Sequence, residues 1–367
     1  MVSGFVSNGI PELIFGRGAF QQMAKRVLPF GTRVLVVGGV YTDSHPGFLK
    51  EAFDYLSVSG LQVTHVSAGG KQTEEAAQMI RADINRDAYD CVISIGGSRA
   101  IDVGKLLSVG LPHIAVPTTA GTGAAMNGVI FGGASAYEET QKTVLVPTIV
   151  FADPSFIDEM DRDDFAARAL GVFTLLMEAY VSPKASVLSD ALVWSGLEAF
   201  ARGFVAGVEG KTEGRDDVFY ASLLAGVGSG QAGFGLTHQL AAAFEQKTKL
   251  SYAQANATIC AEVSDIIIEA LSDRLPDAEA MDKYALVGEL ISSRSYEDRE
   301  EAYASLIGTL RRWVARLELP KLDLSPRELS AVSQALLDEW DDQVLPVRLY
   351  EEEMMQALLR RCARASG

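Results

Sequence analysis

Residues Asp90–Lys105 read DCVISIGGSRAIDVGK, and this stretch decides the fold. Its first part, Asp90–Ile95, is rich in β-branched residues and predicts a buried strand. Two glycines follow, and the chain then enters a predicted helix that carries Asp102 and Lys105. In open α/β sheets, glycines in such a turn let the backbone approach a phosphate, which a helix N-terminus binds. The alternative is a tight turn that binds no ligand.

The same alternation continues on both sides of this stretch. Further strands are predicted at 32–37, 61–66, 113–117 and 148–152, and helices at 46–57, 73–85 and 101–107. Strands that alternate with helices predict a parallel sheet with crossover helices. After residue 153 only helical patterns occur, at 163–181, 189–208, 214–230, 236–245, 252–271, 278–290, 300–317, 325–341 and 351–365. We therefore predict an α/β domain over 1–153 and an all-α domain over 154–367.

The composition excludes several classes of protein. The chain has 367 residues, of which 48% are hydrophobic and 22% are charged, as in an ordinary globular protein. A net charge of -16 without any basic run argues against nucleic-acid binding. Cys91, Cys260 and Cys362 are too scattered for a disulfide framework or a zinc knuckle. We saw no run of roughly 20 apolar residues that would span a membrane, so we predict a cytoplasmic protein with no membrane partner.

Two further turns follow predicted strands. Gly38 and Gly39 end the first strand, and IAVPTTAGTGAAMN, which contains Thr118–Gly123, brings hydroxyls and backbone donors to the end of another. These turns predict a nucleotide site at one edge of the sheet. Gly228–Gly233 reads GSGQAG and matches the dinucleotide fingerprint, but it follows a helical pattern. We interpret those glycines as positions of close helix packing.

Five motifs occur in order between Phe15 and Ala257: GGSRAIDVGK, PTTAGTG, FADPS, EAYVSPKAS and GLTHQLAAAF. Together they resemble the iron-containing alcohol dehydrogenase family, and more loosely its maleylacetate reductase branch. The resemblance implies the dehydroquinate synthase-like, or iron alcohol dehydrogenase, architecture. In that architecture a Rossmann-like domain precedes a helical domain, and the active site lies in the cleft between them. It also implies NAD(P)H as the cofactor and hydride transfer as the chemistry.

The resemblance assigns cofactor contacts by position. Gly96, Gly97 and Ser98 would hold the pyrophosphate, while Asp102 and Lys105 would support that turn or reach the nicotinamide ribose. The remaining cofactor-binding residues implied by the resemblance are Gly38, Gly39, Thr118, Thr119 and Thr122. Relatives that prefer NAD often carry an aspartate at the position of Gly39, so this chain permits NADPH without requiring it.

The segment GVFTLLMEAY departs from the family pattern. In metal-dependent relatives this helix carries an aspartate and, one turn later, a histidine, and these positions are Gly171 and Leu175 here. Two further family histidines fall at His238 and Tyr252, so one ligand of four remains. A catalytic metal needs about three protein ligands, and we therefore predict no metal. A shifted site built from acidic residues stays open, with Glu178, Glu245 and Asp190 as its candidates.

If hydride transfer persists without a metal, other groups must stabilise the alkoxide. His238 is predicted to donate a proton near neutral pH, and Tyr252 to donate a hydrogen bond to the developing oxyanion. Lys142 is predicted to pair with a substrate carboxylate. The alternatives are a core histidine, a packed phenol and a solvated surface charge, respectively. Glu178 is expected to cap or pair locally.

The sequence supports two classes of function. The first is a metal-independent NAD(P)H-dependent reductase of a small keto, enone or imine substrate, with an apolar floor formed by Phe173, Leu175 and Leu176. The second is a non-redox enzyme (a lyase, cyclase or isomerase) or a binding protein on the same scaffold. Departures from the family support the second class, at Arg99, Ala124, Ala125, Gly171, Leu175, Ala242 and Tyr252. The expected partners are a small-molecule substrate and, as is common in the family, a second copy in a homodimer.

Overall fold

A computed structural model describes residues 4–7, 9–69, 72–130, 140–141, 145–317, 319, 321–340 and 344–362, with the backbone alone at 140–141. The chain forms two compact units. One unit runs over Ser7–Glu159, and the other consists of Met160–Gly367 together with Met1–Val6. The boundary lies close to the change of pattern that the sequence shows at residues 153–154.

The first unit is built on a six-stranded sheet in the order β1-β8-β5-β4-β2-β3, in which every neighbouring pair is parallel. The strands are β1 (Glu12–Phe15), β2 (Arg33–Gly38), β3 (Gln62–Ser67), β4 (Cys91–Gly96), β5 (His113–Pro117) and β8 (Ile149–Ala152). From β2 the chain adds β3 on one side and β4 on the other, so the strand order reverses between β2 and β4. Ligands of open α/β sheets bind at such a reversal, beyond the carboxyl ends of the strands.

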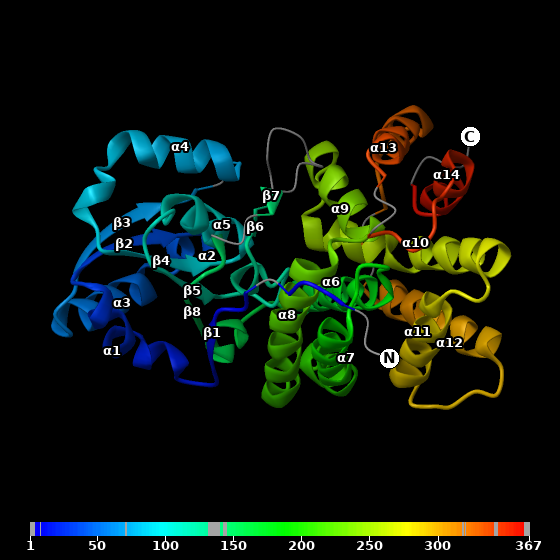
Figure 1. Cartoon of the computed structure of the whole chain (residues 1–367), viewed down its shortest axis with the longest axis horizontal. Coiled ribbons are helices and arrows are strands. Elements are labelled where there is room, and N and C mark those ends of the chain that lie inside the picture. The colour runs from blue at the N-terminus through cyan, green and yellow to red at the C-terminus, as the bar shows by residue number, and fades with distance from the viewer. Residues whose placement is uncertain are drawn as a thin grey trace. The chain divides into compact units, whose positions relative to one another are not determined.

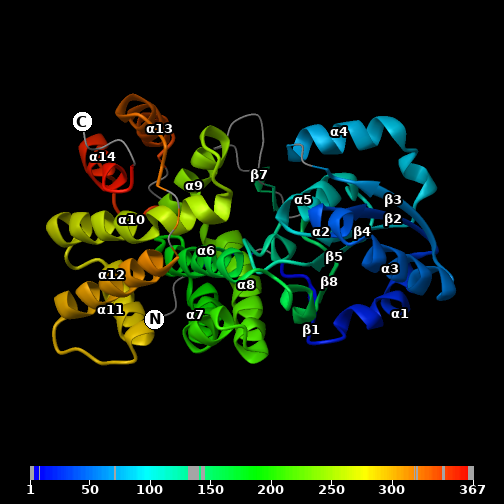
Figure 2. The ribbon, with the colours of Figure 1, turned by 180° about the vertical axis from the view of Figure 1, so that it is seen from behind.

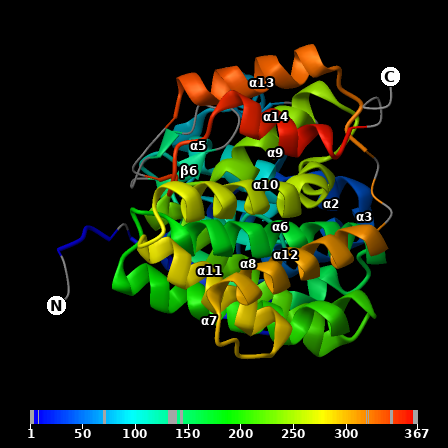
Figure 3. The ribbon, with the colours of Figure 1, turned by 90° about the vertical axis from the view of Figure 1, so that its right-hand side faces the viewer.

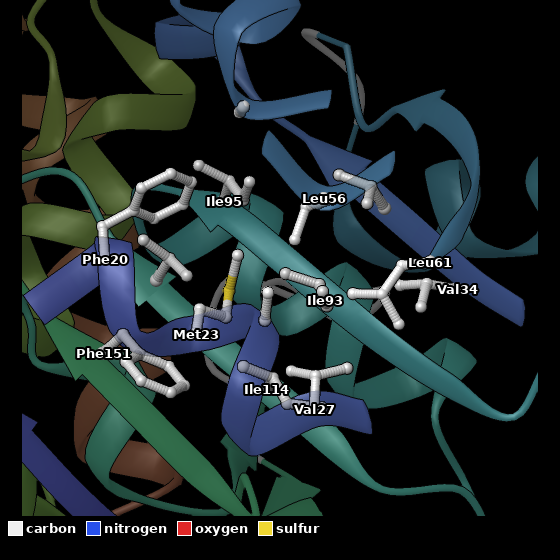
Figure 4. Close-up of a cluster of buried hydrophobic side chains, with 14 of the residues drawn as sticks. Phe20, Met23, Val27, Val34, Leu56, Leu61, Ile93, Ile95, Ile114 and Phe151 are labelled. Atoms are coloured by element: carbon white, nitrogen blue, oxygen red, sulfur yellow. The ribbon is translucent and has the colours of Figure 1, made fainter. Parts of the chain in front are cut away.

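Helices cover both faces of this sheet. α1 (Met23–Val27) and α3 (Pro46–Val58) pack on one face, and α4 (Thr73–Asp83) and α5 (Ser98–Leu107) on the other (Figures 1 and 2). Successive side chains of a strand point to opposite faces. Figure 4 shows the α1 and α3 side, where Val34 and Ile93 meet Met23 and Leu56. Burial on both faces explains why the strands are continuous apolar runs in the sequence.

Three short strands were not predicted. β1 is the edge strand, and β6 (Val129–Ile130) pairs with β7 (Thr140–Gln141) in an antiparallel ribbon. The short helices α1 (Met23–Val27) and α2 (Val40–Ser44) were also not predicted. These elements are too short to show a hydrophobic period, whereas the other five strands follow the predicted ranges within one residue.

The second unit is helical, as the sequence predicts. Its helices are α6 (Arg162–Val181), α7 (Val187–Val208), α8 (Thr212–Ala232), α9 (Leu236–Lys247), α10 (Tyr252–Arg274), α11 (Glu279–Ser292), α12 (Arg299–Arg316), α13 (Pro326–Asp338) and α14 (Glu351–Leu359). Ser186, Ser251 and Ser325 each begin a helix with a reciprocal capping box. α6 is buried on nearly all sides, and α10 packs beside it (Figure 3). The α/β-plus-all-α fold class is thereby confirmed.

Among the described helices, α7 is long and apolar enough to cross a membrane by length and composition alone. The sequence shows no continuous apolar run there, because Asp190, Glu198 and Arg202 interrupt this segment. Its apolar face, which includes Phe200, is buried and packs within the second unit, where Phe200 meets Phe173 of α6 at a ring distance of 5.0 Å. We therefore describe α7 as a core helix of this unit.

Candidate functional site

In the first unit, the turns after β2, β4 and β5 meet at the carboxyl edge of the sheet. A Cβ atom placed on Gly96 would lie 3.5 Å from Gly39 Cα and 2.8 Å from the Ala100 side chain. A Cβ atom on Gly39 would lie 2.9 Å from the same side chain. The Thr118 N–H donates to the Gly96 carbonyl at 3.0 Å, which joins the third turn to the second. Glycine is therefore required by packing at Gly39 and Gly96 of this edge.

The N-terminus of α5 opens onto this edge. Gly97 is its N-cap residue, and no side chain in the described part of the chain caps it. Thr118 Oγ1 is buried, with the residue 1% exposed, and no described group forms a hydrogen bond with it. A Cβ atom on Gly97 would lie 3.3 Å from Thr119 Oγ1. Free helix N–H groups beside threonine hydroxyls are what a phosphate requires.

The other predicted cofactor residues differ in their placement. Gly38 is buried at the end of β2, where a Cβ atom would lie 2.4 Å from Thr42 Oγ1. Ser98 and Arg99 begin α5, and Arg99 is exposed, so its charge adds to the positive end of the helix dipole. Thr122 is half-buried in the segment beyond Thr119.

Asp102 and Lys105 form a buried ion pair under the turn. Lys105 Nζ donates to Asp102 Oδ1 at 2.8 Å and to the Val129 carbonyl at 2.6 Å, and the Lys105 residue is 0% exposed. Burial lowers the pKa of Lys105, against the opposing effect of Asp102. Of the two roles that the sequence left open, the structure favours support of the turn over contact with the nicotinamide ribose.

In the second unit, His238 and Tyr252 lie in direct contact. His238 stands in the first turn of α9, and Tyr252 is the first residue of α10. His238 Nδ1 and Tyr252 Oη are 2.7 Å apart, and Asn256 Nδ2 donates to the same hydroxyl at 3.4 Å. Tyr252 and Asn256 share one face of α10 because they are four residues apart. His238, Tyr252 and Asn256 therefore form one polar cluster.

The imidazole of this cluster is neutral at physiological pH. His238 is 1% exposed, its ring lies 4.2 Å from the Phe234 ring, and burial lowers its pKa to about 3. This differs from the expectation that His238 supplies a proton near neutral pH, because desolvation disfavours the imidazolium. A neutral ring can still donate or accept one hydrogen bond at Nδ1.

Glu178 caps α9 from the neighbouring helix α6. Its Oε1 accepts a hydrogen bond from the Thr237 N–H at 2.6 Å, and a Cβ atom on Gly235 would collide with this carboxyl group. Burial raises the pKa of Glu178 to about 7, against the backbone donors of Thr237 and His238. The expectation of a local cap is met, and this cap fixes the turn that carries His238.

The residues that the resemblance places at metal-ligand positions do not fit a metal. Gly171 and Leu175 bring no ligand atom from α6, and the Tyr252 phenol on α10 is a poor ligand beside the single imidazole of His238. Over the described residues, no group of three or more His, Cys, Asp or Glu side chains is arranged to hold an ion. The shifted site of acidic residues, which the sequence left open, is therefore not found among the described residues.

The predicted apolar floor is wrong for two of its three residues. The Phe173 ring packs on Phe200 of α7 and, at 6.2 Å, on Trp313 of α12. Leu176 packs against Gly196 of α7, where a Cβ atom would lie 2.7 Å from it. Positions 173 and 176 share one helix face, whereas 171, 175 and 178 share another. Only Leu175 lies on the face that carries Gly171 and Glu178.

Two other sequence interpretations have different outcomes. Lys142 lies outside the described residues, and its role stays a prediction. Gly228 lies inside α8, where a Cβ atom would lie 2.6 Å from Val193 Cγ2 and 3.1 Å from Ala179 Cβ. The interpretation of GSGQAG as close helix packing is therefore confirmed at this position.

Asn256 was not singled out from the sequence, although it completes the cluster. The signal was present in SYAQAN, because Tyr252 and Asn256 stand four residues apart in a predicted helix. Without the fold, nothing distinguished this pair from other polar residues at helical spacing.

A glycine edge on a parallel sheet and a buried polar cluster in a following helical unit define a dehydrogenase-like protein of two units. Family profiles of the iron-containing alcohol dehydrogenase match residues 11–154, and those of the C-terminal region of the Fe-containing alcohol dehydrogenase family match residues 165–362. The chain belongs to the iron-containing alcohol dehydrogenase family. The predicted family and the predicted class of enzyme, an oxidoreductase, are confirmed, while the maleylacetate reductase branch stays a prediction.

Individual relatives agree with this assignment. The chain is 25% identical to the 4-hydroxybutyrate dehydrogenase of Clostridium kluyveri over 308 residues, which are 77% of this chain and 80% of the relative. It is 26% identical to long-chain-alcohol dehydrogenase 1 of Geobacillus thermodenitrificans over 339 residues, 83% of this chain and 82% of the relative. Among solved structures, a 1,3-propanediol oxidoreductase has a TM-score of 0.85 at 20% identity, with 98% of this chain and 100% of that chain covered.

Proposed function

We propose that this protein is a metal-independent, NAD(P)H-dependent reductase of a small keto, enone or imine substrate. The observation that carries the proposal is the contact between His238 Nδ1 and Tyr252 Oη, 2.7 Å apart, at two of the family's metal-ligand positions. By the resemblance, hydrogen-bonding groups occupy positions at which metal-dependent relatives carry ligands. The relatives include an NADPH-dependent butanol dehydrogenase and an NAD-dependent methanol dehydrogenase, which supports a nicotinamide cofactor here.

The residues of the first unit fit such a cofactor. Gly39 and Gly96 let the first two turns approach each other closely, the N-terminus of α5 offers N–H donors, and Thr118 Oγ1 is a buried hydroxyl whose described surroundings offer no partner. The cofactor, when bound, supplies the hydride. Lys105 and Asp102 hold the turn from beneath.

The residues of the second unit are suited to manage the proton. When the His238 Nδ1–H and Asn256 Nδ2–H groups both donate to Tyr252 Oη, this oxygen accepts two hydrogen bonds. Its own O–H group then acts as the donor toward a substrate. Reduction of a carbonyl adds the hydride to carbon, and Tyr252 transfers its proton to the oxygen. The two N–H donors then stabilise the phenolate until water returns the proton. A neutral His238, as its burial dictates, suits this role.

No step of this mechanism needs an ion. A metal would polarise the carbonyl and stabilise the alkoxide, and direct proton donation removes the same charge. The metal-independent part of the proposal rests on the donor atoms present, since Gly171 and Leu175 provide none and Tyr252 is a poor replacement for histidine.

Two measurements test the proposal. Titration with NADPH and NADH, followed by nicotinamide fluorescence, should give saturable binding of at least one of them. A panel of small ketones, enones and imines should then show cofactor oxidation in protein freed of metal by a chelator. Absence of binding by both cofactors would refute the reductase. Binding without turnover across the panel would favour the non-redox enzyme or binding protein.

The setting and the partners of the protein are part of the proposal. The acidic charge of -16 and the absence of a basic run favour a cytoplasmic protein that acts on a small molecule and binds no nucleic acid. A homodimer follows from the family resemblance. Light scattering coupled to size-exclusion chromatography measures that mass directly, and a mass near 39.3 kDa would identify a monomer.

A further inference from the structure

The carboxylate of Asp43 is held at the carboxyl edge of the sheet, beside the ends of β2 and β3. Gly38 and Ser67, the last residues of these two strands, are register partners. Asp43 belongs to α2, the short helix after β2, and its Oδ2 atom accepts a hydrogen bond from Ser67 Oγ at 2.8 Å. Ser67 Oγ in turn accepts a hydrogen bond from the Gly69 N–H at 3.0 Å. The Asp43 side chain is therefore fixed in place although it is exposed.

The charge of this carboxylate is not neutralised by a neighbouring cation. Over the part of the chain that the structure describes, no donor forms a hydrogen bond with Asp43 Oδ1, and no basic side chain forms an ion pair with Asp43. A carboxylate oxygen of this kind can accept a hydrogen bond from a hydroxyl group of a ligand. It also repels a phosphate group, which carries a charge of about -1.5 to -2 near neutral pH.

The strand order indicates which part of a dinucleotide would meet Asp43. Dinucleotides bind with a glycine turn at the pyrophosphate and an acidic residue at the end of the next strand outward, where it accepts from the ribose 2′-hydroxyl group. Here the glycine turn follows β4, the threonines lie on the side of β5, and the next strand outward on the other side is β2. The adenosine ribose is therefore expected at the ends of β2 and β3.

Asp43 is the acidic side chain at this place. Gly39, directly after β2, has no side chain for the contact with the ribose. The Asp43 N–H donates to the Gly39 carbonyl at 3.0 Å, so Asp43 follows Gly39 by one turn of helix. Its hydrogen bond with Ser67 keeps the carboxylate at the ends of the strands and leaves the other oxygen for a ligand.

We propose that Asp43, held by Ser67, is a specificity-determining residue that selects NADH over NADPH. The inference rests on the proposed function, since it takes a nicotinamide nucleotide as the ligand of this edge. Asp43 Oδ1 accepts a hydrogen bond from the 2′-hydroxyl group of the adenosine ribose. In NADPH a phosphate ester replaces that group, so the donor is lost and two negative charges face each other. Because Asp43 is exposed, solvent screens the repulsion, and the expected preference is about tenfold.

Fluorescence titration of the full-length protein with NADH and with NADPH measures both dissociation constants without turnover. At low ionic strength the constant for NADPH should exceed that for NADH about tenfold. This ratio should fall severalfold at about 1 M sodium chloride, where the screening length is ~3 Å. Asp43→Asn keeps an oxygen acceptor for Ser67 and removes the charge. Its ratio should fall to about two or less, mainly through tighter binding of NADPH.

Asp54→Asn is the matched control. Asp54 is exposed in α3 of the same unit and forms no hydrogen bond or ion pair within the described residues. The variant removes the same charge and should leave the ratio unchanged. An unchanged ratio in Asp43→Asn, or an equal fall in both variants, would overturn the assignment of Asp43.

Ser67→Ala tests the positioning of the carboxylate. It keeps the charge of Asp43 and removes its hydrogen bond at the strand ends, so the ratio should fall about two- to threefold. A ratio equal to that of the wild-type protein would remove Ser67 from the assignment.

The outcomes for the wild-type protein separate this inference from the proposed function. Equal affinity for NADH and NADPH, or tighter binding of NADPH, would overturn selection by Asp43 and would leave the reductase in place. Binding of neither cofactor would refute both.

Discussion

The glycine edge of the first unit and the polar cluster of the second unit are constrained by packing to different degrees. At the edge, Gly39 and Gly96 are held by packing, since a Cβ atom on either would lie within 2.9 Å of Ala100. In the cluster, Gly171 is not required by packing, since the nearest described atoms to a Cβ atom there lie 3.9 Å away. The comparison teaches that close packing fixes the residue type at the edge, whereas it leaves position 171 of the cluster open to other residues.

The largest expected effect concerns the cluster. Tyr252→Phe removes the hydroxyl group and keeps the ring, so kcat should fall about 10³-fold, within the range that general acid catalysis contributes. NADPH affinity and melting temperature should stay close to wild-type values, because the edge is untouched. Steady-state kinetics at saturating cofactor measure this effect. A rate within threefold of wild type would show that Tyr252 is only a packed phenol.

The second effect concerns the edge. In Gly97→Val the added side chain meets Thr119, whose Oγ1 atom would lie 3.3 Å from the new Cβ, and it covers the N-terminus of α5. The dissociation constant for NADPH should rise about 100-fold, which corresponds to roughly 2.7 kcal/mol. Fluorescence titration measures it, with Gly47→Val as a control, because a Cβ atom there meets nothing within 4 Å. Equal affinity in both variants would move the cofactor away from this turn.

The third effect is a pH dependence of stability in the second unit. Burial raises the pKa of Glu178 from 4.5 to about 7. The folded protein therefore binds this proton more tightly than the unfolded chain, and the associated stability is lost as pH rises through 7. Glu178→Gln keeps the acceptor for Thr237 and does not titrate. Relative to wild type, its free energy of unfolding should rise by about 2–3 kcal/mol between pH 5 and pH 8.

Urea unfolding of both proteins at the two pH values checks this prediction. His238, whose folded pKa is about 3, shifts stability in the opposite direction as pH falls below 6.5, and it does so in both proteins. The difference between variant and wild type thus isolates Glu178. A constant difference would mean that Glu178 stays ionised in the folded protein.

The smallest expected effect is the most direct test of the comparison. Dialysis against a chelator should leave turnover within twofold of the starting value, because Gly171, Leu175 and Tyr252 supply no ligand set. Elemental analysis of protein purified without chelator accompanies the assay. One tightly held zinc or iron ion per chain, lost together with activity, would return the cluster to the chemistry of its metal-dependent relatives.

Only part of the site could be predicted from the sequence. The pattern of glycines after strands identifies the edge, and the family resemblance singles out His238 and Tyr252 as two positions at which relatives carry histidines. The polarity of their surroundings could not be predicted, so His238 was expected to titrate near neutral pH. The same limit explains why the buried partner Asn256 was missed and why Phe173 and Leu176 were wrongly assigned to the apolar floor. Helical spacing shows which residues share a face, but not which face meets which helix.

The sequence by itself determined the two units, the parallel sheet and the glycine edge. The reason is that hydrophobic periodicity and the positions of glycines are local properties, which can be seen within a few consecutive residues. The tertiary structure alone decided that Lys105 is buried against Asp102, that Glu178 caps α9, and that an unpaired oxygen of Asn256 faces Gly171. The physical reason is that desolvation and hydrogen bonding depend on which atoms of distant segments come together. Local sequence patterns do not show how deeply a polar side chain is buried or which distant group it meets.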